Sequence, residues 1–199
     1  MENPIIAIVG RPNVGKSTFF NRVLKQRKAI VDAIEGITRD RIYGEMEWAG
    51  HYLTFIDTGG YIPEDLDIFN SAVRQQAQAA VAEADLILLM VDGREDPTAS
   101  DKTLAQFVRE SGKKVILVVN KCDSLESDQQ INGYYELAID PIQPVSALTG
   151  RLSGDLLDMI LEILNLKDVK PTVAVKEGMQ LAIVGMPNVG KSSILNALI

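Results

Sequence analysis

The feature of this sequence that most restricts its fold is a glycine-containing motif that occurs twice. Gly10–Ser17 reads Gly-Arg-Pro-Asn-Val-Gly-Lys-Ser and directly follows the apolar run Ile5–Val9. It matches GxxxxGK[ST], the pattern of a phosphate-binding loop. Ile6–Leu24 and Leu181–Ile199, aligned at an offset of 175, are identical at 11 of 19 positions. Two copies in the same context argue against a chance glycine turn and predict a repeated strand–loop–helix unit.

The positions of the two copies predict the domain organisation. A chain of 199 residues has room for one domain of ordinary size and a remainder. We expect the first domain over residues 1–166 and a linker without a helical stripe over residues 167–178. Residues 179–199 are expected to be the truncated start of a second domain, with a strand, a P-loop and a short helix.

Short apolar runs that alternate with segments of helical period predict an α/β fold. We expect a Ras-like P-loop NTPase with a mixed, mostly parallel sheet and helices on both faces. The expected parallel strands are Ile5–Val9, Leu53–Ile56, Leu86–Val91, Val115–Val119 and Ile142–Val145. The residues expected to form the apolar stripes of helices are Phe69, Val73, Ala77, Ala80, Val81, Ala84, Leu104, Phe107, Val108, Leu156, Leu157, Ile160, Leu161 and Leu164.

A hairpin is expected to add one antiparallel strand to this sheet. Its arms are Ile42–Trp48 and Tyr52–Ile56, separated by Ala49-Gly50-His51. His51, the single histidine, is therefore predicted to be an exposed turn residue.

Composition excludes several classes of function. The formal charge of -7 argues against a broad electrostatic contact with nucleic acid. The single cysteine, Cys122, cannot form an intrachain disulfide, and the longest apolar runs are far too short to cross a bilayer. With no recognisable targeting segment at the N-terminus, we expect a cytoplasmic protein that does not contact membranes.

The first phosphate-binding loop supplies the chemistry for a polyphosphate. Its glycines let backbone N–H groups turn towards phosphate oxygens, and the following helix adds a favourable dipole. Lys16 is expected to contact the β- and γ-phosphates, and Ser17 to offer its hydroxyl to Mg²⁺. The predicted nucleotide-binding residues of this loop are Gly10, Arg11, Pro12, Asn13, Val14, Gly15, Lys16, Ser17 and Thr18.

Asp57-Thr58-Gly59-Gly60 leaves the second predicted parallel strand and is expected to complete the phosphate site. Asp57 would hold Mg²⁺ through water, and the N–H of Gly60 would contact the γ-phosphate. On its own such a sequence also fits a plain aspartate turn. The phosphate-site interpretation therefore depends on the order and spacing of this motif relative to the other motifs.

A hydroxyl on a loop before the hairpin is also needed to bind Mg²⁺ when a nucleoside triphosphate is present. Thr38 is the only Ser or Thr between residues 19 and 53, and it is assigned by elimination. The alternative is an ordinary turn or cap residue.

Asn120-Lys121-Cys122-Asp123 follows the fourth strand and predicts selection of guanine. The Asp123 carboxylate can accept from both the ring N–H and the exocyclic amine of guanine, an arrangement that adenine lacks. The stem of Lys121 can lie along the base, and Asn120 can join neighbouring loops. Ser146, Ala147 and Leu148 can offer a backbone N–H to the guanine oxygen. GTP and GDP are therefore the expected ligands, and a P-loop ATPase is the disfavoured alternative.

With both phosphate loops reading Gly-x-Pro-Asn-Val-Gly-Lys-Ser and these motifs between them, the chain resembles the Der (EngA) family of bacterial tandem GTPases. The resemblance implies two GTPase domains, a KH-like domain and a role in assembly of the large ribosomal subunit. Era and MnmE share the individual motifs but lack the repeat. No basic or aromatic nucleic-acid surface is visible in this acidic sequence, so the ribosomal role rests on the resemblance.

The residue after the Asp57–Gly60 motif is Tyr61 and not the glutamine that orients water in Ras-type enzymes. The resemblance implies that a K⁺ ion near the β- and γ-phosphates takes part, with Asn13 as its ligand; the alternative role of Asn13 is a turn residue after Pro12. We expect a slow, Mg²⁺-dependent and K⁺-stimulated GTPase with four catalytic residues, Lys16, Thr38, Gly60 and Asn13. The alternatives are a switch with negligible hydrolysis on its own and another translation-factor-class GTPase related to Era and MnmE.

The second phosphate loop is expected to form an incomplete site, because no second copy of the base-reading motif, Asn-Lys-Cys-Asp, follows it in this sequence. Its residues are Gly185, Asn188, Gly190, Lys191 and Ser192.

Overall fold

The computed structural model describes residues 3–25, 42–58 and 78–166, without the side chains of residues 126–130. Several predictions therefore lie outside the described residues. These are the linker and the second unit at 167–199, the helical-stripe residues Phe69, Val73 and Ala77, and also Thr38, Gly59, Gly60 and Tyr61.

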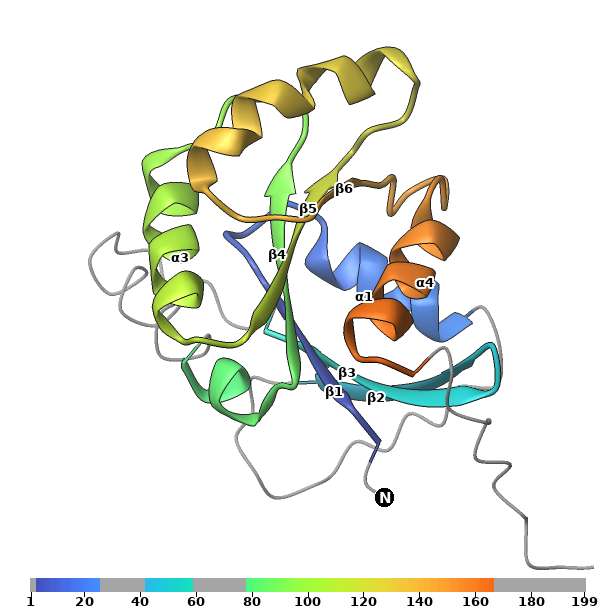
Figure 1. The fold of residues 1–199 in the computed structure, drawn as a ribbon. Helices are drawn as coiled ribbons and strands as arrows, with labels where there is room; N and C mark the ends of the chain where they lie inside the picture. Colours follow the sequence, from blue (N-terminus) through green and yellow to red (C-terminus); the bar gives the residue numbers. More distant parts are fainter. Residues whose placement is uncertain (1–2, 26–41, 59–77, 167–199) are drawn as a thin grey trace, which may run out of the picture.

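The described part of the chain forms one sheet, with the strand order β2-β3-β1-β4-β5-β6 (Figure 1). The strands are β1 (Ile5–Val9), β2 (Ile42–Trp48), β3 (His51–Asp57), β4 (Leu86–Asp92), β5 (Lys114–Asn120) and β6 (Ile142–Pro144). Only β2 and β3 pair antiparallel; the other neighbours are parallel. The predicted mixed, mostly parallel sheet is confirmed.

Helices cover both faces of the sheet (Figure 1). Helices α1 (Lys16–Lys25) and α4 (Ser153–Ile163) pack on one face. Helix α3 (Ala99–Glu110), the 3-10 helix η1 (Glu126–Leu137) and the helical residues 78–83 pack on the other. No helix among the described residues is long and apolar enough to cross a membrane.

Strand β1 shows why both faces need a helical layer. Ile6 and Ile8 lie in the core beneath α1 and α4, whereas Ala7 and Val9 lie in the core beneath α3 and η1. All four are at most 1% exposed. Alternate residues of a strand point to opposite faces, so a strand apolar at every position must be covered twice.

The hairpin is confirmed, with one correction to its turn. Ala49 (φ 48°) and Gly50 (φ 84°) alone form the turn, and His51 pairs with Trp48 as the first residue of β3. Two residues with positive φ match the right-handed twist of the flanking strands, so a third turn residue is unnecessary. The prediction that His51 lies in the turn is therefore wrong.

Helix η1 was not predicted from the sequence, because it has no regular apolar stripe. The hydroxyl oxygen of its buried Tyr134 lies 2.5 Å from the carbonyl oxygen of Asp92 and 2.6 Å from that of Glu95, and its one proton is shared between these two acceptors. Burial raises the pKa of this phenol well above its usual range. Side-chain anchoring to the loop after β4 thus fixes a helix that periodicity does not reveal.

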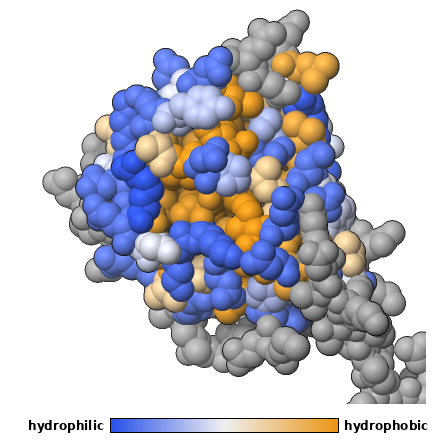
Figure 2. All heavy atoms as spheres, in the orientation of Figure 1, coloured by the Kyte–Doolittle hydropathy of each residue, from blue (hydrophilic) through white to orange (hydrophobic). Residues whose placement is uncertain are grey.

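Figure 2 shows the molecule from the same side as Figure 1, with apolar side chains in the middle of the view and polar side chains around them. The short strand β6 forms the edge of the sheet beyond β5. Ile142 of this edge strand is partly buried and packs against the core on the α3 side.

Candidate functional site

The predicted site residues lie where the parallel strands end. The phosphate loop follows β1, and Asp57, Asp92 and Asn120 are the last residues of β3, β4 and β5. Ser146 comes two residues after β6. Carboxyl ends of parallel strands share one edge of the sheet, and this edge is the ligand-binding side of open α/β folds.

The phosphate loop is held close to its neighbours by its two glycines. A Cβ at Gly10 would lie 2.3 Å from the carbonyl oxygen of Met90, and one at Gly15 would lie 2.2 Å from Nδ2 of Asn120. Gly15 has φ 101° and Asn13 has φ 63°. Asparagine is one of the few side chains that adopt this left-handed conformation readily, so the turn role proposed for Asn13 has a structural basis.

Lys16 is folded back over the phosphate loop. Its Nζ donates to the carbonyls of Gly10, at 2.8 Å, and Arg11, at 2.9 Å, and the residue is 7% exposed. Burial lowers its pKa to about 8, against the opposing attraction of the Asp57 carboxylate. Because the ammonium has already lost most of its hydration, an anion bound at the loop would pair with it at a low additional cost of desolvation.

Asp57 and Thr58 lie beside the phosphate loop because β3 pairs with β1, with Asp57 opposite Ile8. Asp57 is 1% exposed, and the hydroxyl of Thr58 donates to the carbonyl of Ile8 at 2.8 Å. The exposed Ser17 lies in the first turn of α1. A buried carboxylate and a hydroxyl are the hard oxygen donors that suit Mg²⁺, so the described residues fit this ion.

Asn120 joins the loops that are predicted to contact the base to the phosphate loop. Its Nδ2 donates to the carbonyl of Val14 at 2.7 Å, and its Oδ1 accepts from the backbone N–H of Ala147 at 2.8 Å. The residue is 2% exposed. Three loops that are remote in sequence are therefore held together by one side chain.

The Asp123 carboxylate is positioned by two donors. Its Oδ1 accepts from the hydroxyl of Ser146 at 2.7 Å, and its Oδ2 accepts from Nη2 of Arg94 at 2.9 Å. Both hydrogen bonds, that from Ser146 first, lower the pKa of Asp123. The carboxylate stays ionised and remains 38% exposed, as an acceptor for a ligand must be.

Lys121 has a partner that the sequence analysis did not identify. Its Nζ lies 2.5 Å from Oδ2 of Asp92, and its backbone has φ 69°. Asp92 Oδ1 in turn accepts from the backbone N–H of Arg94 at 3.1 Å. The one signal in the sequence for this contact was the position of Asp92 at the end of a parallel strand, close to the other site residues.

The side chain of Arg11, in the predicted nucleotide-binding loop, pairs with acidic residues. Its Nη2 donates to Glu95, and its Nε lies 3.3 Å from Oδ2 of Asp101. Asp101 is the buried acidic residue of the capping box that begins α3 with Thr98. Partial burial lowers the pKa of Arg11, but the hydrogen bonds and negative charges of Glu95 and Asp101 outweigh this effect and raise it. The side chain of Arg11 thus ties the phosphate loop to α3.

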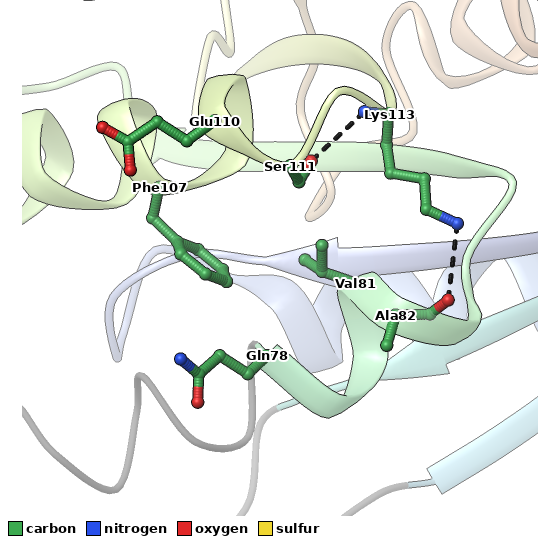
Figure 3. Close-up of a pocket in the computed structure, with 7 residues that line it drawn as sticks. All are labelled: Gln78, Val81, Ala82, Phe107, Glu110, Ser111 and Lys113. Carbon is green, nitrogen blue, oxygen red and sulfur yellow. Dashed lines mark hydrogen bonds between the residues drawn. The ribbon is translucent and has the colours of Figure 1, made fainter.

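A hollow of about 340 Å³ lies elsewhere on the molecule, between residues 78–82 and the end of α3 (Figure 3). Lys113 at its rim donates to the carbonyl of Ala84 at 2.9 Å. Lys113 precedes β5 and Ala84 precedes β4, so the hollow lies at the amino ends of these strands. It is separate from the edge that carries the site residues.

Comparison with known proteins gives matches along the whole chain. The model of the family described as "50S ribosome-binding GTPase" matches residues 5–121 and 180–199. The GTPase Der of Clostridium kluyveri is 46% identical over 199 residues, which is 100% of this chain and 45% of that protein. The chain therefore spans less than half the length of this curated relative.

Two solved structures share the fold. Era, in a complex with MgGDPNP and nucleotides 1506–1542 of 16S ribosomal RNA, has a TM-score of 0.65 and 33% identity; the match covers 81% of this chain and 57% of Era. The G domain of the FeoB iron transporter of T. maritima has a TM-score of 0.61 and 25% identity, over 82% of this chain and 99% of that domain.

Proposed function

The chain belongs to the family of 50S ribosome-binding GTPases, and on that basis we propose that it binds GTP and GDP at the described sheet edge and hydrolyses GTP slowly. The observation that carries this proposal is the pair of hydrogen bonds made by Asn120, to Val14 and from Ala147. A phosphate loop and a predicted base-contacting loop held side by side can bind the phosphates and the base of one nucleotide at the same time.

The phosphates would lie against the phosphate loop, within reach of Lys16. This residue supplies a positive charge that is already stripped of much of its water, and the start of α1 adds its dipole. Binding the phosphates gives this ammonium a strong anionic partner. The loop therefore favours di- and triphosphates over nucleosides.

The guanine base would lie against Asp123, whose exposed carboxylate can accept from two donors of the base. Ala147 already donates its N–H to Asn120, so the guanine oxygen must either compete for this N–H or take that of Leu148. With Lys121 drawn to Asp92, the stem of this lysine can border the base pocket.

Mg²⁺ would be held by Ser17 and Asp57, together with Thr38 in the triphosphate state, and would neutralise charge that develops on the phosphate oxygens. Gly59 and Gly60 would bring backbone N–H groups to the γ-phosphate. The fit of Ser17 and Asp57 supports this assignment, and Thr38, Gly59 and Gly60 rest on the sequence.

A K⁺ ion bound by Asn13 would provide the charge that an arginine finger provides in other GTPases. The exposed side chain of Asn13 on the phosphate loop supports this assignment. Its φ of 63° shows that the residue also serves the turn, and the two roles are compatible.

A role in assembly of the large ribosomal subunit, with residence in the cytoplasm, is proposed from the match to Der and the family description. No described surface is assigned to the ribosome. The formal charge of -7 favours contacts made by a local site over a broad electrostatic one.

Single-turnover cleavage of GTP by the purified chain tests the hydrolytic part of this proposal. With Mg²⁺ present, we expect slow release of phosphate that stops when the ion is chelated. If the chain binds GTP tightly and releases no phosphate, the alternative of a switch without intrinsic hydrolysis is correct.

A further inference from the structure

We propose that Arg22, on α1, positions the base-reading loops and so contributes to the preference for guanine; the proposal rests on the guanine-nucleotide site proposed above. Arg22 belongs to none of the recognised nucleotide-binding motifs. It would act through its neighbours and without touching the nucleotide itself.

Arg22 binds two consecutive carbonyls of the loop after β6. Its Nε donates to the carbonyl of Ala147, and its Nη2 donates to the carbonyl of Leu148. The loop then closes around the guanidinium at Gly150, where φ is 89° and a Cβ would lie 2.9 Å from Nη1. One charged group therefore fixes two peptide planes.

The orientation of these peptides determines what faces the ligand. The only cis peptide in the described residues precedes Pro141, so both of these peptides are trans and their N–H groups point opposite to their carbonyls. With the Ala147 carbonyl turned towards α1, the N–H of Leu148 points away from α1. This N–H is the one available to the guanine oxygen, because that of Ala147 is donated to Asn120.

The second peptide leads to the base-reading carboxylate. Its N–H, on Thr149, donates to the hydroxyl of Ser146 at 3.1 Å, and this hydroxyl donates to Oδ1 of Asp123 at 2.7 Å. Ser146 is fully buried, so its hydroxyl has little freedom to turn. Arg22 is thereby linked to Asp123 through a continuous series of hydrogen bonds.

Both contacts to the base therefore depend on one side chain. The N–H of Leu148 would meet the guanine oxygen, and Asp123 would meet the ring N–H and the exocyclic amine. Inosine diphosphate keeps the oxygen and the ring N–H but lacks the amine. The ratio of GDP to IDP affinity thus reports how well Asp123 is placed.

The test is to measure GDP and IDP affinities of the 199-residue chain by calorimetry for Arg22→Ala, Arg22→Lys and the unsubstituted protein. We expect Arg22→Ala to weaken GDP binding about tenfold, equivalent to about 1.4 kcal/mol, and IDP binding by less. The GDP affinity of Arg22→Lys should lie between those of Arg22→Ala and the unsubstituted protein, since an ammonium cannot hold both carbonyls as a planar guanidinium does. Arg109→Ala, at an exposed position in the last turn of α3, is the matched control and should change neither affinity.

An equal loss of GDP and IDP affinity in Arg22→Ala, or no loss at all, would overturn the positioning role. If Arg22→Ala fails to fold, as judged by its circular dichroism, the GDP to IDP ratio of Arg22→Lys decides the question in the same way. If the unsubstituted chain does not bind GDP, the proposed function fails together with this inference. Selective GDP binding with an unchanged ratio in the variants would refute the role of Arg22 alone.

Discussion

Nδ2 of Asn120, at the end of β5, donates to the carbonyl oxygen of Val14 in the phosphate loop at 2.7 Å. The residues are 106 positions apart in the sequence. This contact makes the phosphate loop and the base-reading motif parts of one structure before any nucleotide arrives.

Replacing Asn120 with Ala should destabilise the chain as well as weaken GDP binding. The change leaves the carbonyl of Val14 and the N–H of Ala147 without their buried partner, at a cost of about 2 to 4 kcal/mol in the free energy of unfolding. Urea unfolding of the nucleotide-free chain measures this cost. Asn21→Ala, on the exposed side of α1, is the control and should be nearly neutral; similar unfolding for both variants would disprove the structural role of Asn120.

Replacing Asp123 with Asn should exchange preference for guanine nucleotides for preference for xanthine nucleotides. The amide brings its own donor to face the donors of guanine, and the loss of GTP affinity should be about 1 to 3 kcal/mol. Competition against a fluorescent nucleotide measures both ligands, with Asp155→Asn at an exposed position of α4 as the control. Unchanged GTP affinity together with no gain for XTP would remove Asp123 from base recognition.

The stability of the nucleotide-free chain should rise as the pH increases from about 8 to 10.5, because the pKa of Lys16 is about 8 in the fold and about 10.5 in the unfolded chain. Below about pH 8 Lys16 is charged in both states, and the fold bears the full cost of burying the charge. Above that pH the unfolded chain binds more protons than the folded chain, so raising the pH favours folding, by up to about 3 kcal/mol. Unfolding midpoints of the unsubstituted chain and of Lys16→Met, followed over this range, isolate the effect. If the unfolding midpoints of the unsubstituted chain and of Lys16→Met changed with pH in the same way, Lys16 would not be a buried charge in the fold.

K⁺ should accelerate GTP cleavage well beyond Na⁺ at equal ionic strength, and removal of the Asn13 side chain should abolish most of this difference. Alanine is a poor choice of variant, since φ at this position is 63° and alanine would add backbone strain. Asn13→Gly accepts the same conformation and removes the amide oxygen, while Asn13→Asp keeps an oxygen ligand. Equal rates in both salts for the unsubstituted chain would refute the K⁺ mechanism.

The sequence was sufficient to predict the sheet and the loops at its carboxyl edge, because apolar runs such as Leu86–Val91 are buried on both faces and end in polar residues. It was insufficient wherever a long-range side-chain contact decides the structure. Tyr134 anchors a helix without an apolar stripe, and Arg11 binds acidic residues of another loop. Arg22 gave no signal either, because its partners are backbone carbonyls, which every residue has.

Titration of the chain with GDP and with ADP tests whether it carries one guanine-nucleotide site. We expect about one GDP per chain and no measurable competition by ADP. Binding should be lost in Lys16→Met and unchanged in Lys191→Met, because the 199 residues contain two phosphate loops and a single Asn-Lys-Cys-Asp motif. Comparable affinity for ADP, or GDP binding that survives the change of Lys16 and is lost with the change of Lys191, would contradict this expectation.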